Sequence, residues 1–409
     1  MTYPLSQSQL SIYLACQGLE PDGGNYQQAS LYKLPGNIDI ERLAAAAEAV
    51  IRAHPYALSR IVLEEGMPRV EDHTGEAWKP LVRTVDSIDE VRPLFCRTMD
   101  LLKDPLFRLE IYQTKEGSYF YIDFHHIIFD GASAQLLIDH LSRAYAGEDL
   151  PAEPIDGFQI SLREEEQRNS EAYAEAAQWY AETFGEGAQL DSRILPDVYG
   201  LPAQPYRELV MDLPVKGEAV KSLIAKYRCA DSVLLTAAFG ATLAAWTANT
   251  RSCFSTIWNG RRGPSLNALS MCVHTMPVFV DADPSLSVAE LLDKMKQQVS
   301  GSRARAFYSF ADCARDLGMN AGISFGYQVS SSPRPFPSVL TERKYPPKTC
   351  GPTRRASVCP SNCSAAPTAA RSSDSGTSLS SIPKRSSASS PRVSLRFSPR
   401  WRKPARLPT

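Results

Sequence analysis

The stretch YFYIDFHHIIFDGASAQLL, residues 119–137, runs from an apolar segment through two adjacent histidines to an Asp-Gly pair. Side chains alternate between the two faces of a strand, so His125 and His126 cannot both face one pocket if the strand continues through them. This argues against a metal site, whose ligands must converge on one point. We expect one ring to point into a cleft and the other into packing. The plainer alternative is that both are core histidines with satisfied hydrogen bonds.

Asp130 follows three apolar residues that indicate burial. A buried carboxylate without a partner is costly, so Asp130 needs a cation or a set of hydrogen-bond donors. Gly131 permits a tight turn, and Asp130 or Ser133 would cap the helix that follows. The apolar stripe of this helix consists of Leu137, Leu141 and Tyr145. A histidine at the end of a strand, beside the first amides of a helix, suits acid–base or electrostatic chemistry.

The remainder of the first 330 residues mixes helices and strands without a strict βαβ repeat, which predicts an α+β fold. No Gly-rich phosphate loop follows a strand, so a nucleotide-binding fold has little support. We expect helices over 163–184, 216–228 and 231–248, a helix capped by Asp39, and a helix that begins with a Ser287–Glu290 capping box. We expect strands at 107–114, 118–124, 253–258 and 275–281. The apolar window 233–246 is too short to span a bilayer and predicts a buried helix capped by Asp231 or Ser232.

Charge divides the chain near residue 330. Residues 331–409 hold 15 Lys and Arg against 2 Asp and Glu, together with 18 Ser and 13 Pro. Residues 1–330 hold the other 29 basic and 43 acidic residues. The tail has no apolar period, which predicts disorder. A basic tail for nucleic acid or membranes would carry Lys/Arg blocks or an amphipathic period. We favour a tail translated in a shifted reading frame; translating all three frames around codon 330 would test this.

The nine cysteines are scattered, with no Cys-x-x-Cys pair and no disulfide framework. This pattern predicts a reducing, cytoplasmic location. The first residues, MTYPLSQSQLSIYL, lack the basic and apolar regions of a signal peptide. Neither a nucleic-acid partner nor a membrane is expected.

The motif HHIIFDG resembles the His-His-x-x-x-Asp-Gly signature of the condensation domains of nonribosomal peptide synthetases. Further matches follow in order over roughly residues 3–330. YPLSQSQLSIYL resembles the opening motif through Ser6 and Gln9, with Ser8 where Ala is usual. RAHPYALSRI resembles the second motif through His54 and Ser59, with departures at Pro55, Ala57 and Leu58. NGRRGPSLNALSMCVHTMPV resembles a later motif through Gly260, Arg261, Val273, Thr275 and Pro277, with Ser270 and His274 as departures. ISFGYQV resembles a late strand.

The resemblance implies a two-lobed fold similar to chloramphenicol acetyltransferase, with the site in a tunnel between the lobes. It places an N-terminal lobe at 1–177, an incomplete C-terminal lobe at 178–330 and the disordered tail at 331–409. The expected partners are donor and acceptor peptidyl carrier domains and the adenylation domain of a synthetase. No cofactor would be bound directly, because the carriers supply the phosphopantetheine arms. No metal is expected.

By the same resemblance, the catalytic residues are His126, His125, Asp130 and Gly131. His126 would act as a general base or would stabilise the tetrahedral centre, and His125 would be structural. Asp130 would pair with Arg261, for which Arg262 is a rival, and Gly131 would place a backbone N–H near the reacting carbonyl. A related acyltransferase, an epimerisation domain and a non-catalytic truncated remnant remain alternatives.

Overall fold

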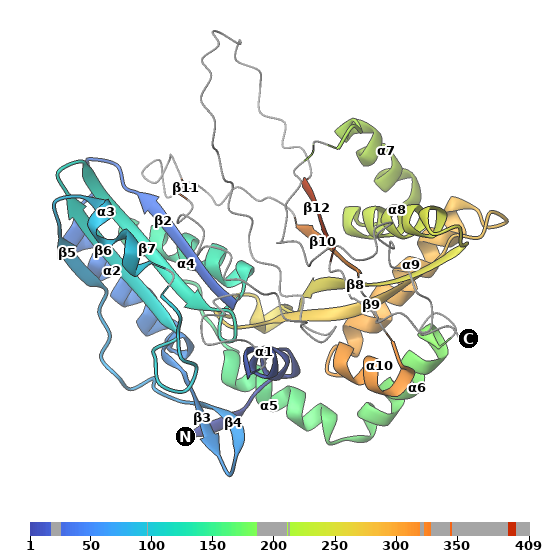
Figure 1. The fold of residues 1–409 in the computed structure, drawn as a ribbon, viewed down its shortest axis with the longest axis horizontal. Helices are drawn as coiled ribbons and strands as arrows, with labels where there is room; N and C mark the ends of the chain where they lie inside the picture. The colour runs from blue at the N-terminus through green and yellow to red at the C-terminus, as the bar shows by residue number, and fades with distance from the viewer. Residues whose placement is uncertain are drawn as a thin grey trace, which may run out of the picture.

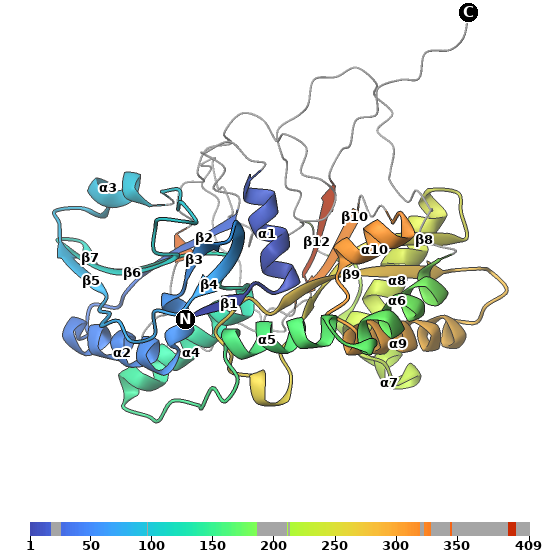
Figure 2. The same cartoon turned by 90° about the horizontal axis from the view of Figure 1, so that it is seen from below.

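The computed structural model describes residues 1–17, 26–95, 97–185, 211, 213–319, 323–328, 344–345 and 392–397. These residues form two lobes, each built on its own mixed sheet, that lie side by side (Figure 1). Helix α1 (Gln7–Gln17) and helix α5 (Gly157–Arg168) lie between the two lobes (Figures 1 and 2). The predicted two-lobed α+β fold is therefore confirmed.

The first lobe contains a five-stranded sheet with the order β11-β2-β7-β6-β5. Its strands are β2 (Gln27–Lys33), β5 (Leu81–Thr84), β6 (Phe107–Thr114), β7 (Gly117–His125) and β11 (Lys344–Tyr345). Helices α2 (Ile40–Ala53) and α4 (Gly131–Ala146) pack in one core with β6 and β7. The short helix α3 (Ile88–Val91) packs with Tyr119 and Tyr121 in a second cluster. Strands β1 (Thr2–Pro4), β4 (Met67–Glu71) and β3 (Arg60–Glu64) form a separate three-stranded sheet.

The second lobe is built on a four-stranded sheet with the order β12-β10-β8-β9. Its strands are β8 (Arg251–Asn259), β9 (Val273–Asp281), β10 (Ile323–Gln328) and β12 (Arg392–Phe397). One core joins this sheet to α6 (Glu171–Phe184) and α10 (Phe310–Leu317), and another joins it to α8 (Asp231–Trp246) and α9 (Val288–Ala304). Helix α7 (Gly217–Tyr227) packs against the α8 core. Short 3₁₀ turns occur at Pro55–Leu58, Arg92–Leu94 and Gly263–Ser265.

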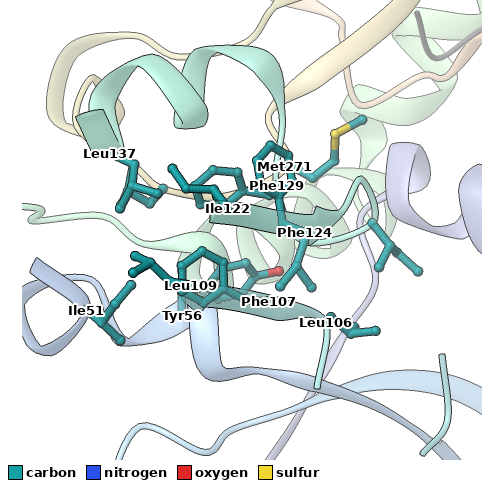
Figure 3. Packing of buried hydrophobic residues seen from close by; sticks show 14 of the residues in the cluster. Ile51, Tyr56, Leu106, Phe107, Leu109, Ile122, Phe124, Phe129, Leu137 and Met271 are labelled. Carbon is teal, nitrogen blue, oxygen red and sulfur yellow. The ribbon is translucent and has the colours of Figure 1, made fainter. Parts of the chain in front are cut away.

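The segment 260–272, between β8 and β9, connects the second lobe to the core of the first. Leu269 and Met271 belong to the same hydrophobic cluster as the first-lobe helices α2 and α4. Figure 3 shows Met271 beside Phe129, above the layer that contains Ile122 and Phe124. The segment between two second-lobe strands thus buries apolar side chains in the other lobe, and these side chains hold the lobes together.

Most predicted elements are present. Asp39 caps α2 by accepting a hydrogen bond from the Arg42 N–H, and the two predicted strands of the hairpin pair antiparallel as β6 and β7. The capping box of Ser287 and Glu290 begins α9. Helix α4 ends at Gly147, whose φ of 82° is the left-handed conformation that glycine adopts without strain.

Two local predictions are wrong. The single helix expected over 163–184 is two helices, α5 and α6, that break at Asn169 and Ser170. Asn and Ser favour helix ends because their short polar side chains compete for backbone groups. The residue that caps α8 is Ala230, not Asp231 or Ser232. The Asp231 carboxylate instead accepts hydrogen bonds from the Ser232 N–H and the Tyr327 hydroxyl.

The division of the chain at residue 177 stays a prediction, and it falls inside α6. The buried side chains of α6, Ala176, Tyr180 and Phe184, pack in a second-lobe core. This packing favours a division between α5 and α6. Within the predicted tail the structure describes β11 and β12, which pair with β2 and β10. The remainder of the tail prediction lies outside the described residues.

Among the described residues no single helix is long and apolar enough to cross a membrane; the bent pair α7 and α8 would be, by length and composition alone.

Candidate active site

Strand β7 ends at His125, residues 126–128 form a turn, and α4 begins at Gly131. The chain leaves the sheet at His126, whose N–H donates to the Tyr26 carbonyl at 2.6 Å. The turn is buried, because Ile127 and Ile128 are fully inaccessible to solvent. The motif therefore lies between the C-terminal end of β7, the middle strand of the first-lobe sheet, and the first turn of α4.

His125 has a packing and hydrogen-bonding role. Its Nδ1 accepts from the Ile127 N–H at 3.1 Å, and its Nε2 lies 3.9 Å from the Cys16 sulfur. An Nδ1 that accepts carries no proton, so the neutral ring carries its proton on Nε2. Burial, and to a lesser extent the neighbouring His126, lowers the pKa of His125 to about 3. The ring is neutral and closes the turn, as the structural role expected for it requires.

His126 is equally buried but differently bonded. The two residues are 5% and 6% exposed, so the expectation that one ring opens into a cleft is not met among the described residues. Hydrogen bonding separates them instead, because His126 Nδ1 is buried without a partner among the described residues. Burial lowers the pKa of His126, opposed by the charge of Asp130 and by the carbonyls of His126 and Phe129. The ring is therefore a neutral imidazole with unused hydrogen-bonding capacity.

Asp130 has the partners that its burial demands. Its Oδ1 accepts from the Ser133 N–H at 2.8 Å, which caps α4. Its Oδ2 accepts from Arg261 Nη1 at 2.8 Å and from the Cys272 N–H at 2.9 Å. Burial would raise the pKa of Asp130, but Arg261 and the backbone donors outweigh it and the pKa lies below its ordinary value. The carboxylate is ionised and cross-links the two lobes.

Arg261 is the cation of this pair, and its side chain is 2% exposed. The guanidinium also donates to the Ala268 carbonyl, the Asn259 side chain, the Ser133 hydroxyl and the Ser270 carbonyl. Arg262, the rival, is exposed. Gly260 lets the segment turn here, because a Cβ on it would lie 2.6 Å from the Cys272 carbonyl oxygen. The segment 260–272 is therefore folded around one buried arginine.

Neither Gly131 nor Cys272 adds a reactive side chain. Gly131 is the first residue of α4, at the positive end of the helix dipole. Burial, the largest cause, raises the pKa of the Cys272 thiol to about 11, so this cysteine is not a thiolate nucleophile. No cluster of metal-ligating side chains is found in the described part of the chain.

Sequence reasoning missed a buried chain of three polar side chains beside the site. His54 Nδ1 lies 2.7 Å from Glu153, and His54 Nε2 lies 2.8 Å from His140 Nδ1. Glu153 also accepts from the Leu269 N–H at 2.8 Å. These residues are 99 and 86 positions from His54, so no local pattern could have identified them. They attach α4 and the segment 260–272 to the end of α2.

The lowered pKa values of the buried histidines lead us to expect that acid destabilises the fold. Burial lowers the pKa of His125 to about 3 and of His140 and His274 to about 4, against about 6.5 in the unfolded chain. Below pH 6.5 the unfolded chain then binds more protons than the folded chain. For each of these histidines, the free energy of unfolding falls by about 1.4 kcal/mol per pH unit as the pH falls from 6.5 toward the folded pKa. Glu164 opposes this, since burial raises its pKa to about 7. The neutral Glu164 carboxyl makes its whole contribution to the free energy of unfolding below about pH 4.5, and this contribution is lost as the pH rises to 7.

Three such histidines oppose one glutamate, and the lowered pKa of His126 acts in the same direction as the histidines. We therefore expect the free energy of unfolding to fall by at least about 2.8 kcal/mol per pH unit between pH 6.5 and 4.5. Urea unfolding at several pH values measures this slope. In Glu164→Gln the opposing group no longer titrates, so the slope should increase by about 1.4 kcal/mol per pH unit. A flat profile in the original chain, or an unchanged slope in the variant, would contradict these assignments.

Comparison with known proteins identifies the family. The family model described as the condensation domain matches residues 1–330. The chain belongs to the condensation-domain family. The match ends where the composition changes. Condensation domains of nonribosomal peptide synthetases are acyltransferases that form amide bonds between carrier-bound substrates.

The relatives are large synthetases. Surfactin synthase subunit 1 of Bacillus subtilis (strain 168) is 25% identical over 330 residues, and tyrocidine synthase 2 of Brevibacillus parabrevis is 24% identical over 325. The alignments cover 79% and 78% of this chain but 9% of each relative. The chain therefore spans about a tenth of the length of these proteins.

Solved structures share the fold. The first condensation domain of the calcium-dependent antibiotic synthetase, in complex with a substrate analogue, has a TM-score of 0.65 and 20% identity, covering 84% of each chain. The condensation domain of the Monacolin K polyketide synthase MokA has a TM-score of 0.65 and 18% identity, covering 78% of this chain and 77% of that one. At these identities the likeness establishes the fold, and the roles of individual residues depend on the geometry given above.

Proposed function

We propose that this chain joins a carrier-bound acyl or peptidyl thioester to the amine of a carrier-bound aminoacyl thioester. The observation that supports this most directly is His126, a neutral imidazole with an unpaired nitrogen, next to the Asp130–Arg261 pair that joins the lobes. In the reaction the amine nitrogen attacks the thioester carbonyl, the C–S bond breaks, and the proton lost by the amine ends on the departing thiolate. A thioester is already activated, so no protein nucleophile is needed.

His126 acts in one of two ways in this proposal. A neutral ring accepts the proton of the attacking amine, which is typically worth 10²- to 10⁴-fold in rate. Alternatively it donates a hydrogen bond to the tetrahedral centre, a contribution of similar size. Orientation of two tethered substrates supplies a larger effect, up to roughly 7–11 kcal/mol. Because His126 is 6% exposed, substrates reach it only when the residues around it separate, so the proposal requires a more open state.

The partners follow from this chemistry. Donor and acceptor peptidyl carrier domains present the substrates on phosphopantetheine arms, and an adenylation domain of the same synthetase loads them. The arms belong to the substrates, and no bound cofactor is proposed for this chain. A cytoplasmic location is part of the proposal, because Cys229, Cys272 and Cys313 are free thiols.

Reconstitution with loaded carriers tests the proposal. The chain is incubated with a panel of acyl- or peptidyl-loaded donor carriers and aminoacyl-loaded acceptor carriers, and the acceptor arm is analysed by mass spectrometry and chiral chromatography. We expect a new amide on the acceptor arm, with both substrate masses and without inversion. A D-residue on an arm without amide formation would indicate an epimerisation domain. No product across the panel, with a folded protein, would indicate a non-catalytic chain.

A further inference from the structure

Helix α1 donates a hydrogen bond to the histidine turn, residues 126–128, through the buried side chain of Gln9. Gln9 is 2% exposed, and its Nε2 donates to the Ile127 carbonyl and to the Tyr56 hydroxyl oxygen, both at 2.8 Å. Its Oε1 accepts from the Ser6 N–H at 3.0 Å. Both protons of the amide group and its oxygen are therefore used. One of the partners, Ile127, is the residue directly after His126.

The turn needs this donor. Within residues 126–128 the N–H groups donate to Tyr26, to the His125 ring and to the His125 carbonyl. Ile127 is fully buried, and its carbonyl accepts a hydrogen bond from Gln9. A buried carbonyl without a donor is unfavourable, so losing Gln9 favours rotation of the peptide that follows Ile127. That rotation changes the backbone on which the His126 ring is mounted.

We propose that Gln9 is a positioning residue for His126. Its amide fixes the peptide that follows Ile127, and this peptide sets the direction of the neighbouring imidazole. Gln9 does not touch the substrates and acts through the turn. The inference rests on the proposed function, since it assigns Gln9 a role in the same reaction. It assigns α1 a part in catalysis in addition to its packing between the lobes.

The chain offers a matched control in Gln298. This glutamine on α9 is also buried, at 9% exposed, and bridges the N–H and carbonyl of Phe279, each at 3.0 Å. Replacing either glutamine by methionine removes one buried amide at similar volume. Gln298 lies in the core of the second lobe and has no contact with the histidine turn, so Gln298→Met measures the effect of lost stability alone.

The experiment compares kcat, KM and thermal unfolding of Gln9→Met and Gln298→Met on carrier-bound substrates. We expect the two variants to lose similar amounts of stability. Only Gln9→Met should also lose activity, with a fall in kcat of about 10- to 100-fold and a change in KM of less than about threefold. The reason is that a small misplacement of a catalytic group costs up to 10²-fold in rate. Tyr56→Phe removes the other partner of Gln9 and keeps the bond to Ile127, so its kcat should fall less than about threefold.

Gln9→Asn is the second test of the same bond, and it decides the matter if Gln9→Met does not fold. Asparagine keeps the amide group, but its side chain is one methylene shorter, so the amide no longer reaches the Ile127 carbonyl. Its kcat should fall as in Gln9→Met. If the Gln9 variants lose no more activity per folded molecule than Gln298→Met, Gln9 is only a packing residue. That outcome, with His126 variants inactive, rejects this inference and leaves the proposed function intact.

Discussion

Replacement of His126 by alanine is expected to lower the rate of amide formation on carrier-bound substrates by about 10²- to 10⁴-fold. The ring is neutral and its Nδ1 has no partner among the described residues, so it can exchange a proton or a hydrogen bond with a substrate. Thermal stability should change by less than about 1 kcal/mol, because the lost packing is offset by removal of an unpaired buried polar atom. Single-turnover amide formation, followed by mass spectrometry of the acceptor arm, measures the effect.

Two further variants separate chemistry from packing. His126→Asn keeps much of the volume and should be as inactive as His126→Ala. His73, which lies beyond β4 and binds Glu71 and Glu76 at 2.7 Å, is a histidine outside the site, so His73→Ala should keep full activity. If both His126 variants remain folded and retain more than about a tenth of the activity, the ring is not catalytic. The proposed function would then fail.

Replacement of Asp130 by asparagine is expected to lower the free energy of unfolding by about 3–5 kcal/mol. Asparagine can still accept the capping hydrogen bond from Ser133, so the variant keeps the helix cap while it loses the charge and the two hydrogen bonds at Oδ2. What remains is an uncompensated guanidinium whose side chain is 2% exposed. Since the pair joins α4 to the segment 260–272, the loss should also weaken the contact between the lobes. Urea unfolding at pH 7 gives the free energy.

Arg262→Ala is the matched control for this pair. Arg262 adjoins Arg261 in the same segment but is exposed, so removing it should change stability by less than about 0.5 kcal/mol. The double variant Asp130→Asn with Arg261→Met removes both charges and should recover part of the loss. A loss below about 1 kcal/mol in Asp130→Asn would show that the pair contributes little to stability.

Local sequence patterns predicted the parts of the site that are close together in the chain. Asp130 was expected to be buried because three apolar residues precede it, and to cap a helix because Gly131 and an apolar stripe follow. Both features are present. The pairing with Arg261, 131 positions away, came from the resemblance to a family, since burial alone required only some partner.

Other features could not be read from the sequence because they depend on distant contacts. The break between α5 and α6 lies inside a continuous helical pattern, and this pattern hid the tendency of Asn169 and Ser170 to end a helix. The bonds of Glu153 with His54, and of Gln9 with Ile127, join residues about a hundred positions apart. The exposure of His126 depends on which elements pack over it, and alternation along a strand does not contain that information.

The sequence by itself determined the strand, the turn and the capped helix of residues 119–146, because apolar periodicity, glycine and a capping aspartate act within a few residues. It also determined that Asp130 would need a partner, because burying an unpaired charge is costly. Only the tertiary structure decided that this partner joins two lobes, that both histidines are enclosed, and that α1 donates a hydrogen bond to the turn. These outcomes depend on how lobes pack against each other, and that packing brings together groups that no local pattern relates.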